Sequence, residues 1–181
     1  RVSPTTAAHV AQEFGDLLWV LDGGPCEVGI ESSIVDCTRG HAVLLRPGML
    51  TRELIEAAAG ESLLDRDAAA PRASGTLASH YAPRATVQLV SSDVLQSALA
   101  QCGEEEASGL AVYSRTLRPD ARPDVLMLAM PADAALAAQE LFSVLRDLDA
   151  LGVQRILVEQ PPDTPEWEGV RDRLQRAAAA R

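Results

Sequence analysis

At 181 residues the chain is long enough for one or two small domains, and its hydrophobic content of 47% is sufficient for a buried core. The net charge of −10 argues against a protein that grips nucleic acid by neutralising phosphates, and no apolar run reaches the length of a membrane span, so no membrane partner is expected. Three scattered cysteines have the spacing of neither a metal site nor a disulfide framework, which indicates reduced thiols and a cytoplasmic protein.

The first predicted element is a helix that begins at Ser3. Serine suits the N-cap position and Pro4 suits the first helical position. Apolar residues then recur at helical spacing as far as Phe14, and Gly15 suits the end of the helix. Because free N–H groups and the positive end of the dipole point out of a helix N-terminus, Ser3 is either a plain cap or a contact to a phosphate.

A short buried strand is predicted at residues 17–21, followed by a glycine-rich turn and a β-hairpin. The two arms of the hairpin are residues 28–36 and 42–46, which are rich in β-branched and apolar residues. The polar turn between them contains Gly40, and glycines and a proline close both outer ends. Neither arm is therefore expected to extend further.

The register of this hairpin predicts a pair of polar side chains. If Asp36 faces Ala42 across the turn, Ser32 lies opposite Arg46 on an otherwise apolar face. A buried arginine needs an anionic or hydrogen-bonding partner, and its fork geometry suits phosphate or carboxylate. The two readings are a ligand bound by Ser32 and Arg46, or a solvated end of the strands.

The hairpin is followed by a helix and a linker. Thr51 is the predicted cap of a helix at residues 52–59, which Gly60 ends. Residues 63–85 lose periodicity and contain several prolines, which indicates a linker. Apolar and aromatic residues around Tyr81 would be of little use to a simple tether, so the linker is expected to dock on the protein.

Strands and helices alternate in the remainder of the chain, which predicts a parallel, Rossmann-like sheet. No G-x-G-x-x-G or P-loop pattern indicates a nucleotide site there, and the three glutamates at 104–106 are expected in a solvated loop. The strands are expected at residues 86–90, 110–113, 125–129 and 155–159, and the helices at residues 93–101, 133–151 and 167–180.

Five motifs follow one another along the first 83 residues. They are residues 3–6 (Ser-Pro-Thr-Thr), 21–26 (Leu-Asp-Gly-Gly-Pro-Cys), 28–36 (Val-Gly-Ile-Glu-Ser-Ser-Ile-Val-Asp), 45–48 (Leu-Arg-Pro-Gly) and 74–83 (Ser-Gly-Thr-Leu-Ala-Ser-His-Tyr-Ala-Pro). In this order and spacing the sequence resembles the YrdC-like family, and in particular its two-domain members, the threonylcarbamoyl-adenylate synthases.

The resemblance implies an α/β protein in three parts. Residues 1–62 would be the C-terminal part of a YrdC-like catalytic domain, residues 63–85 a docking linker, and residues 86–181 a small Rossmann-like domain. The chain starts within what resembles a serine-rich motif of the catalytic domain, and it has no lysine to share the charge of a triphosphate. It is therefore expected to be a fragment that lacks the N-terminal half of that domain and to be inactive alone.

The resemblance also implies a reaction and its site. The enzyme would make threonylcarbamoyl-AMP and pyrophosphate from L-threonine, bicarbonate and ATP, and a downstream tRNA-modifying transferase would pass the threonylcarbamoyl group to a tRNA adenosine. ATP contacts fall on Ser3, Arg46 and Tyr81, and the L-threonine contact falls on Ser32. The alternative for Tyr81 is that it only attaches the linker to the domain surface. Mg²⁺ is expected with ATP, but no carboxylate cluster identifies its ligands, and no catalytic residue is identified.

Two other functions remain open on the sequence. One is a non-catalytic module that binds a nucleotide or RNA through the same cleft, and the other is a domain used only for interaction. The acidic charge disfavours direct tRNA binding. A steep dependence of tRNA affinity on salt would indicate the RNA module, whereas a flat or absent response would favour the enzyme.

Overall fold

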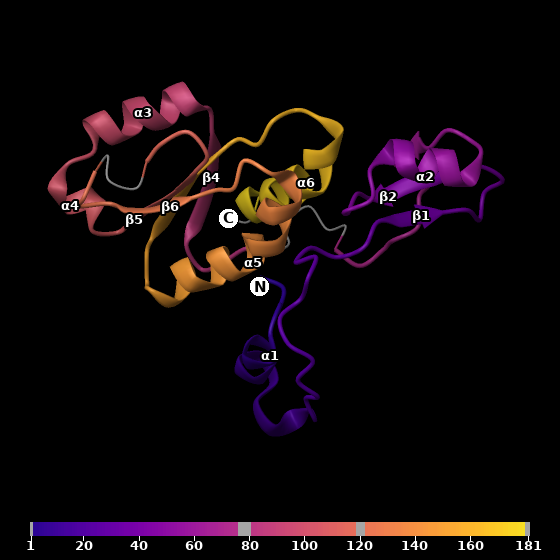
Figure 1. Ribbon diagram of the computed structural model, residues 1–181, viewed down its shortest axis with the longest axis horizontal. Helices are drawn as coiled ribbons and strands as arrows, with labels where there is room; N and C mark the ends of the chain where they lie inside the picture. The colour runs from indigo at the N-terminus through magenta and orange to yellow at the C-terminus, as the bar shows by residue number, and fades with distance from the viewer. Residues whose placement is uncertain (1, 76–80, 119–121, 180–181) are drawn as a thin grey trace.

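The computed structural model describes residues 2–75, 81–118 and 122–179, which form two separate β-sheets and the helices around them. In Figure 1 the C-terminal α/β unit lies beside a small hairpin unit, and the first helix projects away from both. Within the described residues, every helix is too short or too polar to cross a membrane.

Helix α1 (Ala7–Phe14) begins later than the sequence predicted, and Ser3 is not its cap. The N-cap is Thr6, whose backbone is extended and whose Oγ1 accepts a hydrogen bond from the main-chain N–H of His9 at 3.2 Å. The helix ends at Gly15, as predicted, with a positive φ of 54°.

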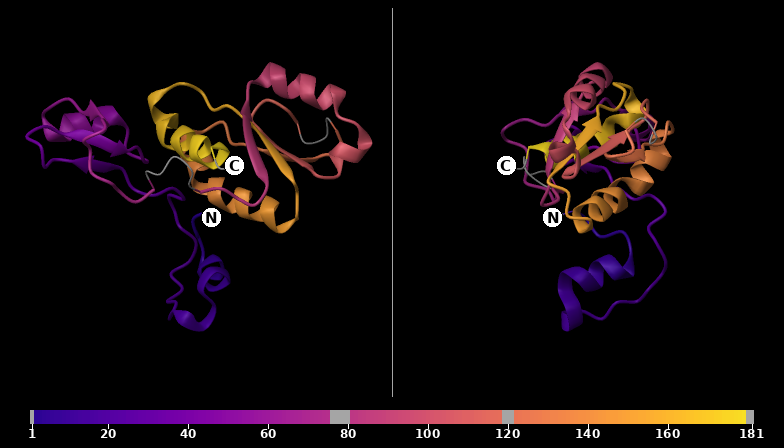
Figure 2. Two further views of the ribbon diagram at one scale, coloured as in Figure 1. Left: turned by 180° about the vertical axis from the view of Figure 1, so that it is seen from behind. Right: turned by 90° about the vertical axis from the view of Figure 1, so that its left-hand side faces the viewer.

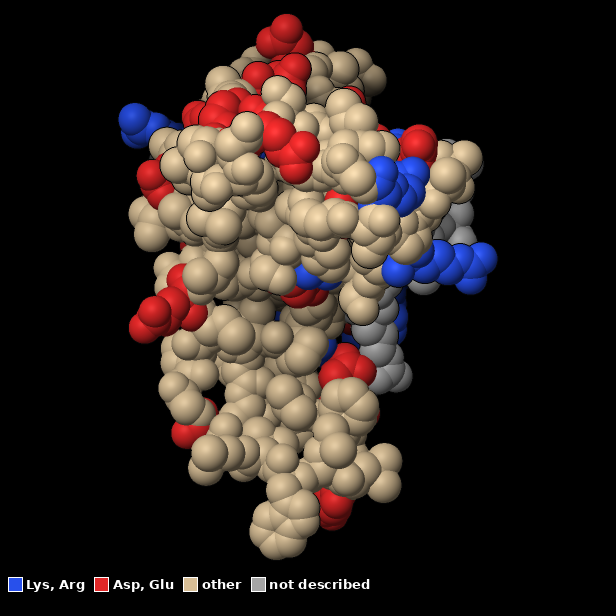
Figure 3. Space-filling view, turned by 90° about the vertical axis from the view of Figure 1, so that its right-hand side faces the viewer, with Lys and Arg blue, Asp and Glu red and all other residues tan. Residues whose placement is uncertain are grey.

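The strand predicted at residues 17–21 is wrong. A 3₁₀ turn, η1 (Gly15–Leu17), is followed by chain that pairs with no strand among the described residues. Trp19 and Leu21 are fully exposed, at 104% and 98%. In Figure 3 the projecting part at the bottom of the molecule carries few charged side chains. The residue types suit a strand, but without a neighbouring strand they form no ladder of hydrogen bonds.

The predicted hairpin is present, but its arms are shorter and its register differs. Strand β1 (Ile34–Asp36) pairs antiparallel with β2 (Val43–Arg46). Arg46 lies opposite Ile34, not opposite Ser32, and the register shifts between Ile34 and Val35. The pairing already differs by one residue at the turn, where Asp36 lies opposite Val43 and not opposite Ala42, and the irregularity adds a further residue to one arm.

The small sheet has a third member. Strand β3 (Leu64–Asp65) pairs parallel with β2, so the predicted linker begins with a strand. Between them lies α2 (Arg52–Ala59), as predicted, with Thr51 as the N-cap and Gly60 in the left-handed conformation at its end.

The C-terminal sheet is parallel throughout and has the strand order β4-β7-β5-β6, which confirms the Rossmann-like prediction. Its strands are β4 (Thr86–Val90), β5 (Leu110–Ser114), β6 (Leu126–Ala129) and β7 (Arg155–Glu159). Its helices are α3 (Ser92–Gln101), α4 (Glu104–Ala107), α5 (Ala134–Ala150) and α6 (Glu168–Ala178), with a 3₁₀ turn, η2 (Pro165–Trp167), before the last. The loop predicted at residues 104–106 is wrong, because Gly103 starts the short helix α4 there.

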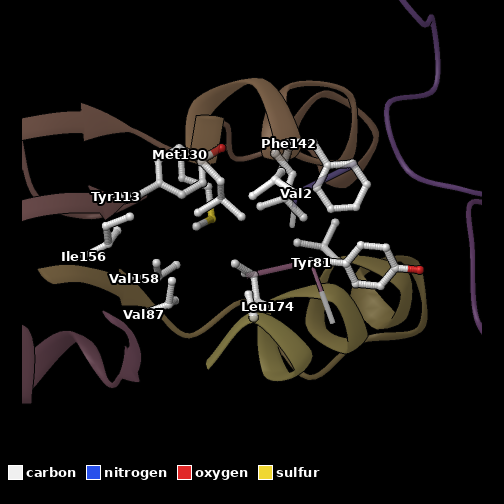
Figure 4. Packing of buried hydrophobic residues seen from close by; sticks show 14 of the residues in the cluster. Val2, Tyr81, Val87, Tyr113, Met130, Phe142, Ile156, Val158 and Leu174 are labelled. Atoms are coloured by element: carbon white, nitrogen blue, oxygen red, sulfur yellow. The ribbon is translucent and has the colours of Figure 1, made fainter. Parts of the chain in front are cut away.

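Helices cover both faces of this sheet, as the views in Figures 1 and 2 agree. Alternate residues of β5 face opposite layers: Tyr113 packs in the core under α5 and α6, and Val112 packs in the core under α3. The core under α5 and α6 also takes in Val2, Ile30 and Tyr81 from outside the C-terminal sheet unit, and Val2 and Tyr81 are shown in Figure 4. The earlier part of the chain is therefore attached to this unit by buried contacts.

Candidate functional site

Arg46, the last residue of β2, is a buried cation with an exposure of only 5%. Its Nε and Nη2 donate to the main-chain oxygen of Ser32 at 3.1 and 2.8 Å, and its Nη1 donates to the main-chain oxygen of Ser74 at 2.8 Å. These acceptors are neutral, and over residues 2–75, 81–118 and 122–179 no carboxylate forms an ion pair with Arg46. A guanidinium cannot lose its proton, so its positive charge stays in the site.

Ser32 does lie beside Arg46, although the predicted cross-strand pairing is wrong. The contact is made by the carbonyl of Ser32 and not by its hydroxyl. The residue itself is exposed. Its hydroxyl is therefore at the surface, next to the segment that a buried arginine fixes.

The linker returns to β2 at Gly75, where only glycine fits. Gly75 has a φ of +72°, and a Cβ there would lie 1.8 Å from Tyr81 Oη and 2.7 Å from Arg46 Nη1. The absence of a side chain at Gly75 thus lets the phenol and the guanidinium approach the same point of the linker. Residues 76–80 of this motif lie outside the described residues.

Tyr81 is buried, at 1% exposure, and its ring stacks on that of Phe142 in α5 with centroids 5.2 Å apart. Burial, together with the negative charge of Glu31, raises the pKa of the Tyr81 phenol, so the hydroxyl stays protonated. Tyr81 also has a φ of 63°, an uncommon conformation for a side chain of this size. The end of the linker is therefore anchored in the C-terminal core at a constrained position.

Ser3 joins the site through Glu31. Its Oγ donates to Glu31 Oε1 at 2.6 Å, and the other carboxylate oxygen, Oε2, accepts from Arg173 Nε of α6 at 2.9 Å. Burial raises the pKa of Glu31, but the hydrogen bonds from Ser3 and Arg173 outweigh burial, and the pKa lies below its usual value. Glu31 is therefore a carboxylate near neutral pH, held between a hydroxyl and a guanidinium.

Sequence reasoning missed Arg173, which is fully buried. Its Nη1 donates to Pro47 O at 2.9 Å and its Nη2 donates to Glu31 O at 3.2 Å, so it reaches both main-chain segments that flank the predicted site. The signal was present in the pattern, because Arg173 lies at helical spacing among Val170, Leu174 and Ala177, which are all buried. A charged residue within an apolar stripe needs a partner.

The structure thus brings the four predicted residues into one neighbourhood. Ser32, Arg46 and Tyr81 meet around the end of β2 and Gly75, and Ser3 is connected through its hydrogen bond to Glu31. The neighbourhood offers a buried positive charge, hydroxyl groups and an aromatic ring. Such a set can bind an anion and position a polar ligand.

The described residues include no group of three or more histidine, cysteine, aspartate or glutamate side chains that could hold a metal ion. The carboxylate nearest the site, Glu31, is already hydrogen-bonded to Ser3 and Arg173. The residues present therefore do not fit an Mg²⁺ site, and no residue of this chain is assigned to that ion.

Comparison with known proteins identifies the family. The family model described as "Threonylcarbamoyl-AMP synthase, C-terminal domain" matches residues 50–179, and the model described as "Telomere recombination" matches residues 1–48. Threonylcarbamoyl-AMP synthases from Bacillus subtilis and Pyrococcus abyssi are each 32% identical to the chain over 100% of its length.

The solved structures include the crystal structure of P. abyssi Sua5 complexed with L-threonine, which is 31% identical to the chain. It superposes with a TM-score of 0.82 over 98% of this chain and 54% of its own. The chain spans about half the length of the curated relatives, since it covers 55% of both the B. subtilis and the P. abyssi proteins. The family match extends over most of the sequence, and the chain belongs to the threonylcarbamoyl-AMP synthase family.

Proposed function

We propose that this chain is part of an enzyme that makes threonylcarbamoyl-AMP and pyrophosphate from L-threonine, bicarbonate and ATP. The observation that carries the proposal is the buried Arg46, which bonds to main-chain carbonyls and has no carboxylate partner among the described residues. A triphosphate would supply the missing negative charge. The relatives are named for the product, threonylcarbamoyl-AMP, and the solved structure of P. abyssi Sua5 contains L-threonine, which supports the proposal.

The product dictates the chemistry of the proposed reaction. The amine of threonine and bicarbonate condense to a carbamate with loss of water. A carbamate oxygen then attacks the α-phosphorus of ATP, and the bond to the β,γ-diphosphate breaks to release pyrophosphate. In such a nucleotidyl transfer, positioning and the neutralisation of phosphate charge supply most of the rate enhancement.

The four predicted residues take separate roles in this proposal. Arg46 neutralises phosphate charge: three of its five N–H groups bind carbonyls and its side chain also hydrogen-bonds to Tyr81, so it acts on the phosphate chiefly through its positive charge. The exposed hydroxyl of Ser32 holds the threonine. Tyr81 closes the site from the linker, and Ser3 contacts ATP once its hydroxyl exchanges Glu31 for the nucleotide. Mg²⁺ is expected to accompany ATP, without ligands from the described residues.

The proposed product is a reactive anhydride that a downstream transferase would use to modify a tRNA adenosine. We place this reaction in the cytoplasm, where the free cysteines of the described chain would stay reduced. With a net charge of −10, the chain itself is not proposed to bind tRNA directly.

The direct test is release of pyrophosphate that requires both L-threonine and bicarbonate. We expect residues 1–181 alone to be inactive, because Arg46 has no lysine in the chain with which to share the triphosphate charge, and because residues such as Leu17 and Trp19 lie exposed. Adding the upstream half of the catalytic domain, fused or as a separate chain, should restore the reaction. Pyrophosphate release that does not depend on threonine in the restored protein would contradict the proposal, and full activity of residues 1–181 alone would place the active site elsewhere.

A further inference from the structure

We propose that Arg173 of α6 is a positioning residue for the synthase site: it holds the two main-chain segments that carry Ser32 and Arg46. The consequence for substrate binding rests on the proposed function, but the positioning itself does not. The C-terminal unit would then contribute directly to the order of the site, through one side chain.

The contacts of Arg173 carry this proposal. Its Nε and Nη2 bind the carboxylate and the carbonyl of Glu31 at 2.9 and 3.2 Å, one residue before Ser32. Its Nη1 binds the carbonyl of Pro47 at 2.9 Å, one residue after Arg46. A single planar fork therefore fixes both segments relative to each other, since its N–H directions are rigid.

The same guanidinium also reaches the remaining predicted residues. Its carbon atom lies 5.4 Å from the centroid of the Tyr81 ring, within the range of a cation–π contact. Glu31, which Arg173 holds, accepts the hydroxyl of Ser3 at 2.6 Å. Arg173 is thus connected to all four predicted site residues. Ser3 is bonded to Glu31, which Arg173 holds, and Tyr81 contacts Arg173 itself. Ser32 and Arg46 are the sequence neighbours of Glu31 and Pro47, which Arg173 binds.

The main chain of α6 approaches the site as closely as atoms permit. A Cβ at Gly169 would lie 2.6 Å from the carbonyl oxygen of Gly48, and a Cβ at Gly48 would lie 2.4 Å from the main-chain nitrogen of Ser33. The absence of both side chains lets the helix, the end of the second arm and the first arm pack against one another. The helix is therefore placed so that Arg173 reaches its acceptors.

A purely structural role does not require this chemistry. Arg173 is completely buried, and a buried cation needs several compensating partners where an apolar side chain of similar volume needs none. Asp172 of the same helix accepts from Nη1 at 2.7 Å, but the remaining acceptors all belong to the two segments of the site. The charge is directed at those segments.

Arg171 offers a matched control on the same helix. It also donates to two main-chain carbonyls, those of Pro162 and Thr164, and pairs with Asp163. All three partners lie in the loop before α6, and none of them belongs to residues 29–48. Arg171→Met therefore removes carbonyl bonds and an ion pair of the same helix without removing any hydrogen bond to the site segments.

The test is hydrogen–deuterium exchange of residues 1–181, without substrates, for wild type, Arg173→Met, Arg173→Lys and Arg171→Met. Arg173→Met should speed exchange of the amides near Glu31 and Pro47 at least about tenfold, since it removes charge-assisted bonds. Arg173→Lys should give a smaller increase, because one ammonium cannot replace the whole fork. Slow exchange retained in β4 and β7 checks that each variant is folded, and Arg171→Met should leave the site segments at the wild-type rate.

A second measurement separates the positioning from the reaction. This measurement uses the chain supplied with the upstream half of the catalytic domain. In it, Arg173→Met should raise the KM for L-threonine about tenfold or more. Arg173→Lys should raise the KM less, and Arg171→Met should leave it unchanged. If Arg173→Met speeds exchange at the site but the wild-type protein shows no threonine-dependent release of pyrophosphate, the proposed function is refuted and the positioning role of Arg173 stands. Equal exchange at the site in Arg173→Met and Arg171→Met would overturn the inference, whatever the activity.

Discussion

The two ends of this chain are built differently. In residues 86–179 a parallel sheet lies between helices, and α5 buries its whole apolar stripe against it. In residues 2–75 neither α1 nor α2 buries a single residue, and most of the large exposed apolar side chains of the described chain lie there. The C-terminal unit carries an extensive core of its own, whereas the described part of residues 2–75 has only one small apolar cluster.

What order the earlier part has comes largely from contacts with the C-terminal unit. Val2 and Ile30 are buried in the cluster formed by α5 and α6, and Arg173 binds both segments around the site. The small cluster of Ala42, Leu44 and Leu63 is the only core of its own that the described part of residues 2–75 has. The candidate site therefore lies where a region with a small core packs against a region with an extensive core.

The largest effect should come from matched leucine truncations in the two regions. Leu141 in α5 is completely buried, so Leu141→Ala should lower the free energy of unfolding by about 2–5 kcal/mol. Leu21 is 98% exposed, so Leu21→Ala should change it by no more than about 0.5 kcal/mol. Urea unfolding of both variants measures the difference, and comparable losses would mean that residues 17–21 are buried in solution.

The next largest effect concerns the buried cation of the earlier region. In the active protein, Arg46→Ala should weaken ATP binding by about 1.5–3 kcal/mol, roughly ten- to a hundredfold in Kd, because it removes a charge-assisted phosphate contact. Arg39, in the turn of the same hairpin, already pairs with Asp36 and Asp67, so Arg39→Ala should have little effect. Titration calorimetry with ATP distinguishes the two, and equal affinities would rule out Arg46 as a phosphate contact.

A smaller effect should come from adding a methyl group at the linker. Gly60→Ala and Gly75→Ala both place alanine at a positive φ, of 74° and 72°, which costs about 1–2 kcal/mol. A Cβ at Gly60 meets nothing within 4 Å, whereas one at Gly75 would overlap Tyr81 Oη. Gly75→Ala should therefore destabilise by about 1 kcal/mol more, measured by urea unfolding. Equal losses would indicate that Tyr81 is not packed on Gly75 in solution.

The smallest effect is a pH dependence at Glu31. Its pKa is lowered in the folded chain by bonds from Ser3 and Arg173 that outweigh its burial, and Tyr81 and Asp172, which pairs with the same Arg173, also lie around it. A depressed carboxyl pKa adds stability above the unfolded value, and this stability is lost as the pH falls through the folded value. Glu31→Gln should therefore reduce the loss of stability below the usual carboxyl range. Identical slopes of unfolding free energy against pH for wild type and Glu31→Gln would contradict the assigned pKa shift.

In residues 86–179, which have the extensive core, the sequence predicted most strand and helix boundaries to within one or two residues. The strands at 86–90 and 155–159 have the predicted bounds, and the helix predicted at 133–151 is α5, one residue shorter at each end. In these segments the periodicity, the caps and the burial all favour the same structure. The short helix α4 (Glu104–Ala107) was missed, because a single helical turn is too short to show a periodic pattern of apolar residues.

The predictions failed where order depends on distant residues. The run at 17–21 has the composition of a strand but no neighbouring strand among the described residues, and composition alone does not show that. The register that was expected to pair Ser32 with Arg46 differs by one residue at the turn, where Asp36 lies opposite Val43, and by one more at the irregularity between Ile34 and Val35. Ser32, Arg46 and Tyr81 still lie close together. The carbonyl of Ser32 binds Arg46, and Gly75 leaves room for both Arg46 and Tyr81. Cross-strand pairing of side chains predicts neither contact.

The most direct test of this contrast uses the two tryptophans, one in each region. Trp19 is fully exposed and Trp167 is 3% exposed. In Trp19→Phe the emission of Trp167 should be that of a buried indole and should change in one cooperative transition on unfolding. In Trp167→Phe the emission of Trp19 should already be that of an indole in water and should show no such transition. A buried, cooperatively unfolding Trp19 would show that residues 17–21 are packed into a core in solution, and would contradict the account.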